Sequence, residues 1–451
     1  MSTRAELESN AERSCGLFFI RGDMSTRRVI SSSRRQAIDL VLREMSVTAD
    51  MLSKQLIRYY FTLLEAEEFE SEETELLTIY HLNNSIRKHR FWLRNHIKHR
   101  SEHSEYFTFF QTADEETFEN SYRVSRCTFH ELHSLIEPYI RKQDTNYRKS
   151  ISSCERLAVC LKYLATGQSF TTMGKNFKIG LKSVSRIVDE VCDALWNVLQ
   201  PLVMPQPTES DWKEIAKDFD ELWQFKNCTG ALDGKHVYIK APSKTGSSFF
   251  NYKKRFSVVL MCLADARRKI IMIDVGSMGR FSDAGIFDNS VFGKSLKEKR
   301  LNLPAPAPLY QGGAKMPFVF IGDEAFPLME NFMRPYPRDR LNTERKIFNY
   351  RLSRARRIVE ATFGVLTRKW YVYRKDFECK IETVDKAIKA TCVLHNFLIQ
   401  RQPDYINNIE SNMEQTLLSV DDITETQHSS NDGYEVREMY CSYFNNQGKV
   451  P

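Results

Sequence analysis

Four carboxylates stand at positions where a folded chain could gather them. Asp233 ends a short apolar run in GALDGKHVYIKAP, and Asp323 ends another in FVFIGDEAFP. Asp283 follows Ser282 in GRFSDAGIF, a pattern typical of a helix start, and Glu360 lies within the helical stretch RARRIVEATFGVLTRKW. Mg²⁺ prefers carboxylate oxygens as ligands, and two such ions can drive phosphodiester hydrolysis. The four acids are therefore candidate ligands of a divalent-cation site.

Each of the three aspartates also fits a purely structural role. Asp233 can form a turn with Gly234, Asp283 can cap a helix, and Asp323 can lie in a loop. For an isolated Asp these structural interpretations are the simpler ones. What favours a metal site is the placement of all four acids at strand ends and helix positions.

Glu360 is harder to assign to a structural role alone. A 3.6-residue period places the core face of its helix at Val359, Phe363, Leu366 and Trp370. Glu360 then shares the neighbouring face with Arg356, Arg357 and Thr367. A salt-bridged surface Glu fits this pattern, and so does a metal ligand at the border of a basic groove.

Positive charge is concentrated around this helix. Residues 334–375 hold 13 Lys/Arg and 3 Asp/Glu. Residues 401–451 hold nine Asp/Glu and three Lys/Arg, so a net charge of +7 for the chain leaves +13 on residues 1–400. Such a distribution favours a nucleic-acid partner, because Lys and Arg that meet phosphates release counterions. A basic surface that serves only solubility is the alternative.

The elements that must position the acids follow from the hydrophobic pattern. Short β-branched or apolar runs predict strands at 228–232, 237–240, 256–264, 269–275 and 317–322. Helices are predicted at 282–292, 350–370 and 383–400. Strands first, with helices interleaved later, predict an α/β domain over residues 228–400.

Outside this domain the sequence predicts four further segments. They are an unassigned, partly disordered N-terminal region at 1–75, a helical region at 76–200, a proline-bearing linker at 201–227 and an acidic, disordered tail at 401–451.

A helix-turn-helix is predicted within residues 151–200. A short helix at 169–177 and a turn at 178–180 precede a long amphipathic helix at 182–199, which opens with Lys182 and Arg186. In such modules the second helix lies in the DNA major groove, so these two cations are candidate DNA contacts. An ordinary helical hairpin fits the same pattern and is the simpler interpretation.

Several protein classes are excluded or disfavoured. The longest apolar run, Val258–Ala264, is too short to cross a membrane, and the polar start Met1–Asn10 does not predict a signal peptide. The ten Cys are scattered without a C-x-x-C pair, which argues against a disulfide framework or a zinc ribbon. We therefore expect a protein that stays inside the cell.

The sequence resembles the catalytic domain of PIF/Harbinger-type DDE transposases and of the nucleases derived from them. Six blocks carry the resemblance in order: GALDGKHVYIKAP, FFNYKKRFSVVLMCLADA, DVGSMGRFSDAGIFDNS, GDEAFPLMENFMRPYP, IFNYRLSRARRIVEATFGVLTRKW and CVLHNFLI. The resemblance covers residues 228–400 and extends upstream through ERLAVCLKYLATGQSF and KIGLKSVSRIVDEVCDALW, which are similar to the family's helix-turn-helix region. A Pro-rich insertion at 303–309 departs from the pattern.

The resemblance implies an RNase H-like fold with a site for Mg²⁺ or Mn²⁺. The family's metal-binding acids match Asp233, Asp283, Asp323 and Glu360. In such a fold Asp233, Asp323 and Glu360 form the tightest, catalytic trio, and Asp283 is the fourth or a supporting ligand. The family also implies a location in the nucleus, with the cytoplasm as the alternative. It further implies a separate Myb/SANT-like DNA-binding partner.

The leading hypothesis from the sequence is a metal-dependent DNA endonuclease, with strand transfer by a DNA 3′-OH at the same site. Its candidate DNA contacts are Lys182, Arg186, Lys235, Arg354, Arg356, Arg357, Arg368 and Lys369. The alternatives are a domesticated DNA-binding or scaffold protein that has lost cleavage, and a nuclease that acts on RNA. A homo-oligomer is compatible with all three.

Overall fold

The computed structural model describes Ile97 and residues 100–146, 149–402, 404–410 and 430–449. The predictions for residues 1–75 and for the first part of the helical region lie outside these residues. The N-terminal elements of the described part are α6 (Arg100–His103), the π-helix η2 (Tyr106–Phe110), α7 (Glu115–Tyr122), α8 (Arg126–Ile140), α9 (Ser153–Thr166), α10 (Phe170–Asn176), α11 (Leu181–Val203) and α12 (Glu209–Trp223). Among the described residues no helix is long and apolar enough to span a membrane.

A five-stranded mixed sheet follows these helices. Its strands are β1 (Cys228–Tyr238), β2 (Ser257–Ala264), β3 (Ile270–Met278), β6 (Val319–Ile321) and β7 (Phe332–Met333), in the order β3-β2-β1-β6-β7. β1, β2 and β3 pair antiparallel, whereas β6 and β7 run parallel to β1. The predicted mixed sheet with flanking helices is confirmed, and the first two predicted strands are one long strand. β4 (Ala307–Pro308), within the Pro-rich insertion, pairs separately with β5 (Lys315–Met316), which follows the insertion.

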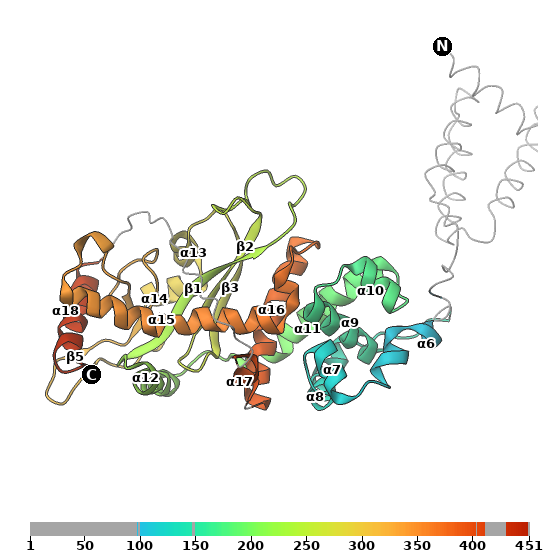
Figure 1. The fold of residues 1–451 in the computed structure, drawn as a ribbon, viewed down its shortest axis with the longest axis horizontal. Helices are drawn as coiled ribbons and strands as arrows, with labels where there is room; N and C mark the ends of the chain where they lie inside the picture. The colour runs from blue at the N-terminus through green and yellow to red at the C-terminus, as the bar shows by residue number, and fades with distance from the viewer. Residues whose placement is uncertain (1–96, 98–99, 147–148, 403, 411–429, 450–451) are drawn as a thin grey trace, which may run out of the picture. The chain divides into compact units, whose positions relative to one another are not determined.

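Helices cover both faces of the sheet, so β2, which pairs with a strand on each side, is buried at every position. Along β2, Val258, Leu260 and Cys262 belong to the core that contains α15 (Thr343–Lys369) and α16 (Ile381–Arg401). Val259, Met261 and Leu263 alternate with them and belong to the core that contains α13 (Asp283–Asn289) and α14 (Val291–Lys297). A strand buried on both faces reads as a continuous apolar run, as this one does in the sequence. Figure 1 shows α15 crossing the sheet over β1.

The helical region packs on the same core through α11. This helix lies along α16, and Asp189 on α11 accepts hydrogen bonds from Thr383 at 3.0 Å and from Lys386 at 2.9 Å. The predicted order of short helix, turn and long helix is present as α10, residues 177–180 and α11. The two short 3-10 helices η3 (Arg338–Arg340) and η4 (Tyr371–Arg374) flank α15.

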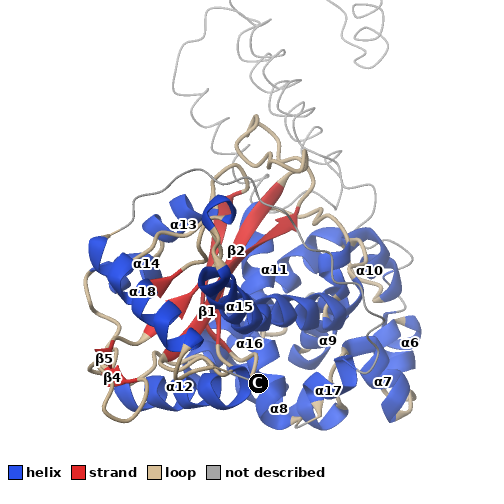
Figure 2. Cartoon of the chain, turned by 60° about the vertical axis from the view of Figure 1, so that its left-hand side comes forward, coloured by secondary structure: helices blue, strands red, loops and turns tan. Residues whose placement is uncertain are grey.

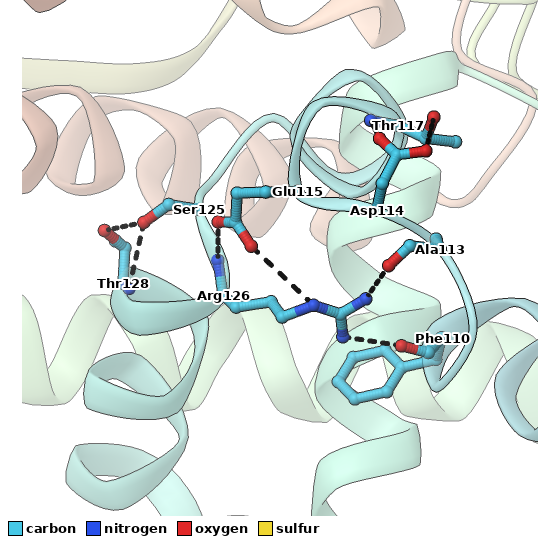
Figure 3. Close-up of polar contacts among 8 residues, drawn as sticks. All are labelled: Phe110, Ala113, Asp114, Glu115, Thr117, Ser125, Arg126 and Thr128. Carbon is cyan, nitrogen blue, oxygen red and sulfur yellow. Dashed lines mark hydrogen bonds and ion pairs between the residues drawn. The ribbon is translucent and has the colours of Figure 1, made fainter.

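One arginine fixes the start of the helical region (Figure 3). Arg126 donates to the Phe110 carbonyl at 2.6 Å and to the Ala113 carbonyl, while its backbone N–H donates to Glu115 at 2.8 Å. The guanidinium satisfies carbonyls left open where η2 ends, and Glu115 begins α7. Neighbouring caps by Asp114 and Ser125 then set the first turns of α7 and α8.

The predicted linker at 201–227 is wrong. α11 continues through Pro201 to Val203, and α12 occupies most of the remainder. Thr208 and Asp211 form a capping box at the start of α12, and Trp212, Ala216 and Phe219 are buried at helical spacing. Trp212 also donates to the Leu301 carbonyl at 2.8 Å. The prolines therefore lie in and just after the end of α11, and the segment continues into a helix that packs against β1.

The prediction of a disordered tail is wrong for residues 405–410 and 430–449. They form α17 (Tyr405–Glu410) and α18 (Asn431–Asn445), and residues 411–429 lie outside the described part. α18 packs beside α15, as Figure 1 shows. Phe444 is fully buried between Phe225 and Phe348, with ring centroids 5.0 and 6.0 Å away. The acidic residues made this segment look solvated, but its aromatic residues complete the core.

Replacing Phe444 with alanine should therefore destabilise the protein. Removal of a buried Phe costs about 3–5 kcal/mol of unfolding free energy because apolar burial is lost and a cavity remains. The matched control is Met439→Ala, on the exposed face of α18, for which we expect a change of about 0.5 kcal/mol or less. Urea unfolding of the two variants measures the difference. Equal losses would show that α18 does not belong to the cooperative core.

Candidate metal centre

Strand register brings two of the acids together. Ala231 on β1 lies beside Ile321 on the parallel strand β6. Asp233 and Asp323 each follow these paired residues by two positions, so they lie side by side, Asp233 within β1 and Asp323 just past the end of β6. Asp283 joins them as the first residue of α13, with Ser282 as the N-cap. One ligand oxygen from each of the three acids lies within 4.8 Å of the other two.

Gly234 makes the approach of Asp283 possible. A Cβ placed on Gly234 would lie 2.4 Å from one carboxylate oxygen of Asp283 and 2.7 Å from its carboxyl carbon. Both separations are far below van der Waals contact, so any larger residue here would displace Asp283. The Asp-Gly pair is therefore a close-packing feature on a strand, not the turn that was the structural alternative.

Glu360 reaches the cluster through Arg356. The Arg356 guanidinium lies 2.6 Å from Glu360 Oε1, one helical turn along α15, and 3.8 Å from Asp233 Oδ1. The acids that the structure brings together are thus Asp233, Asp283 and Asp323, whereas the resemblance implied Asp233, Asp323 and Glu360. The difference has a physical cause, since an arginine holds Glu360 and a glycine admits Asp283.

The cluster carries an unfavourable density of negative charge. Only 15% of the Asp233 side chain is exposed. Burial raises the pKa of Asp233 well above its usual range, the Arg356 guanidinium opposes this rise, and Asp323, Asp283 and Glu360 add to it. A bound cation would relieve the same repulsion.

The donor set fits a hard divalent cation. All the ligand atoms are carboxylate oxygens, which suit Mg²⁺ and Mn²⁺ better than softer metals. The family's general use of divalent metals agrees with this donor set.

Two cationic or polar side chains line β1 beyond Asp233. Lys235 lies with its Nζ 5.6 Å from the Phe363 ring centroid, and burial lowers its pKa although Asp233 opposes this effect. His236 Nδ1 lies 2.9 Å from the Ser257 hydroxyl, so its ring is held against β2. Lys235 remains a candidate phosphate contact beside the acids.

The other candidate DNA contacts divide into exposed and engaged side chains. Lys182 and Arg186 are exposed on the first turns of α11, and Arg357 is exposed on α15. Arg354 and Arg368 are half-buried, and Arg356 is engaged with the acids.

The prediction that Lys369 contacts DNA is wrong. Its ammonium pairs with Glu119 at 3.7 Å and lies 5.2 Å from the Tyr405 ring, joining α15 to α7 and α17. Burial lowers the pKa of Lys369 to about 8. The side chain is therefore part of an interior contact between helices.

Sequence reasoning missed Gly234 as a residue of the site, and it assigned Arg356 to DNA rather than to a position between two acids. The role of Gly234 has no signal beyond its position next to Asp233. Arg356 had a signal, because its spacing of four residues from Glu360 on one helix places the two side chains in reach of each other.

Substitution of Gly234 by alanine should weaken cation binding by displacing Asp283. We expect the affinity for Mn²⁺, measured by isothermal titration calorimetry, to fall by about tenfold, equivalent to roughly 1.4 kcal/mol. Gly364→Ala is the matched control, since a Cβ on this α15 glycine meets nothing within 4 Å. An unchanged Mn²⁺ affinity in Gly234→Ala, with the fold intact, would exclude Asp283 from the ligand set.

Comparison with known proteins agrees with this geometry. Residues 232–396 match the family described as DDE superfamily endonuclease. The chain is 25% identical to "Protein ALP1-like" of Arabidopsis thaliana over 66% of its own length and 74% of that protein. It is 23% identical to "Putative nuclease HARBI1" of Homo sapiens over 58% of its own length and 71% of that protein. No solved structure matches the chain. Residues 232–396 are thus similar to a DDE superfamily endonuclease domain, and the relatives that the chain matches agree with the Harbinger-type resemblance of its sequence blocks.

Proposed function

We propose that this protein is a divalent-metal-dependent endonuclease that hydrolyses DNA phosphodiester bonds, with an RNase H-like catalytic domain. The observation that carries the proposal is the meeting of Asp233, Asp283 and Asp323, with one ligand oxygen of each within 4.8 Å of the others. The strand order β3-β2-β1-β6-β7, with three antiparallel strands followed by two parallel ones, supports the fold assignment. The nuclease names of its relatives support the activity.

The roles of the acids follow from their positions. Asp233 on β1 and Asp323 just past the adjacent strand β6 would provide oxygen ligands, Asp283 would complete the cluster, and Glu360 would be the ligand from α15. Two divalent cations at these oxygens supply an activated water and a counter-charge for the leaving 3′-oxygen. In strand transfer a DNA 3′-OH takes the place of water.

Arg356 has a second role in this proposal. Its guanidinium offsets the negative charge of Asp233 and Glu360 before substrate binds. Arginine binds phosphate oxygens in the same bidentate geometry as carboxylates. Arg356 can therefore exchange a carboxylate for the scissile phosphate, while Lys235 adds positive charge on the β1 side.

The basic surface supports DNA as the substrate. We assign Lys182 and Arg186 to a helix-turn-helix formed by α10 and α11, and Arg354, Arg357 and Arg368 on α15 to backbone contacts. A nuclear site of action, a Myb/SANT-like partner that adds DNA recognition, and a second copy of the chain complete the proposal.

Cleavage should require Mg²⁺ or Mn²⁺ and the clustered acids. Asp233→Asn, Asp283→Asn, Asp323→Asn and Glu360→Gln should each lower the rate at least about 100-fold, because each removes a charged ligand at nearly constant volume. Asp288→Asn is the control, an exposed acid on the same helix as Asp283 that pairs with Lys297. The assay follows nicking of a labelled DNA duplex that contains the terminal repeats of a Harbinger-type transposable element.

Three outcomes of this assay would contradict the proposal. Full activity in Asp233→Asn or Asp323→Asn would refute the metal assignment. DNA binding without cleavage by the wild-type protein in either metal would favour the scaffold alternative. Faster cleavage of an RNA of the same sequence would favour the RNA nuclease.

The helix-turn-helix assignment has its own test. Changing both Lys182 and Arg186 to Ala should weaken duplex binding and reduce the slope of log affinity against log salt by about 1–2, as expected for one or two lost phosphate contacts. Lys213 and Lys217 on α12 provide the control pair, since both are exposed and each pairs with a Glu one turn away, as Arg186 does. If both double variants behave alike, α10 and α11 are a structural hairpin.

A further inference from the structure

Two loops beside the acid cluster expose aromatic rings. Residues 239–256 connect β1 to β2, and residues 279–282 connect β3 to α13. Phe250, Tyr252 and Phe281 in these loops are 42%, 59% and 50% exposed. Lys253, Lys254 and Arg280 are exposed between and beside them. We call these six residues the ring surface; Figures 1 and 2 show its loops extending past the ends of β1 and β2 near α13.

The two loops are fixed to each other through Ser257. Its backbone N–H donates to the Phe249 carbonyl at 2.8 Å, and its own carbonyl accepts from Gly279 at 3.0 Å. Its hydroxyl accepts from the Asn251 amide at 2.9 Å and lies 2.9 Å from His236 Nδ1. Both Asn251 and Ser257 are buried. The exposed rings are thus held on an ordered support.

The ring surface lies next to the proposed catalytic acids. The Tyr252 ring centroid is 5.4 Å from that of His236, three residues beyond Asp233 on β1. Phe281 precedes Asp283 by two residues. A DNA strand seated at the acids must therefore pass these side chains.

Rings interleaved with cations suit unpaired nucleotides better than a duplex. The Lys253 ammonium lies 5.1 Å from the Tyr252 ring and the Arg280 guanidinium 5.7 Å from the Phe281 ring, so two of the three exposed rings have a cation for a neighbouring phosphate. Within a duplex the base faces are stacked on each other, whereas an unpaired base offers its face to an aromatic ring. Single exposed rings are common on protein surfaces, whereas these three lie on two loops that hydrogen bonds of Ser257 hold together.

We propose that the ring surface binds unpaired DNA nucleotides next to the bond that is cut. Tyr252 and Phe281 stack on bases, and Lys253, Lys254 and Arg280 contact the flanking phosphates. This inference rests on the proposed DNA endonuclease function and adds that the preferred substrate has frayed or single-stranded bases at the site.

The test compares two DNAs in EDTA, so that binding is measured without cleavage. One is a blunt duplex, and the other carries the same duplex with three unpaired nucleotides, one of them 2-aminopurine, at the end. The wild-type protein should bind the unpaired end more tightly and quench 2-aminopurine. The double variant Tyr252→Ala/Phe281→Ala should lose at least about fivefold in affinity for the unpaired end, the lower bound for one lost base stack, and less than twofold for the blunt duplex.

Tyr139→Ala on α8 is the matched control, because Tyr139 is an exposed tyrosine outside the ring surface. Tyr252→Phe should behave as wild type, since stacking needs the ring and not the hydroxyl. The inference would be overturned if the double variant kept the wild-type preference for the unpaired end, or if it lost the same affinity for both DNAs. Tighter binding of an RNA end than of the DNA end would overturn its assignment to DNA. Metal-dependent cleavage of the blunt duplex is assayed separately, so failure of the ring surface is distinguishable from failure of the endonuclease.

Discussion

Repulsion between carboxylates is the constraint on which the rest of the structure depends. Three acids from separate parts of the chain lie within 4.8 Å, and a fourth is one arginine away. Like charges at such distances repel each other, so strand pairing and close packing must hold the acids together. Parallel pairing of β1 with β6 sets Asp233 and Asp323 side by side, and Gly234 leaves room for Asp283. Burial of both sheet faces under helices makes that register rigid.

The basic helix α15 serves the interior as much as the surface. Arg351 donates to the carbonyls of Gln224 and Gly448, which ties α15 to the end of α12 and to the segment after α18. Arg356 pairs with two acids of the site, and Lys369 pairs with Glu119 on α7. A dense run of positive charge therefore does not measure the number of DNA contacts. Half-buried and exposed cations such as Arg354 and Arg357 remain for phosphates.

Much of the catalytic domain could be predicted from the sequence because its signals are local. The β-branched run of β2 and the acid at the end of β6 need no tertiary information. α18 could not be predicted in the same way: its segment is acidic, and the burial of Phe444 depends on Phe225 and Phe348 far away in the chain. α12 did have a helical signal in Trp212, Ala216 and Phe219, but the nearby prolines suggested a linker. The choice between Asp283 and Glu360 required strand register and the position of one guanidinium.

Arg356 explains how the acid cluster can exist before any cation binds. Its guanidinium touches Asp233 and Glu360 at once, so part of the charge that a cation would neutralise is already neutralised by the chain. In the proposed function the same guanidinium would compete with a cation for those oxygens, and a bound cation would weaken its contacts with them. The DNA phosphate would then offer this guanidinium a further anion to bind. Cation binding and substrate binding would then favour each other. The cation would take over the carboxylates that Arg356 gives up, and the phosphate would replace those carboxylates at the guanidinium.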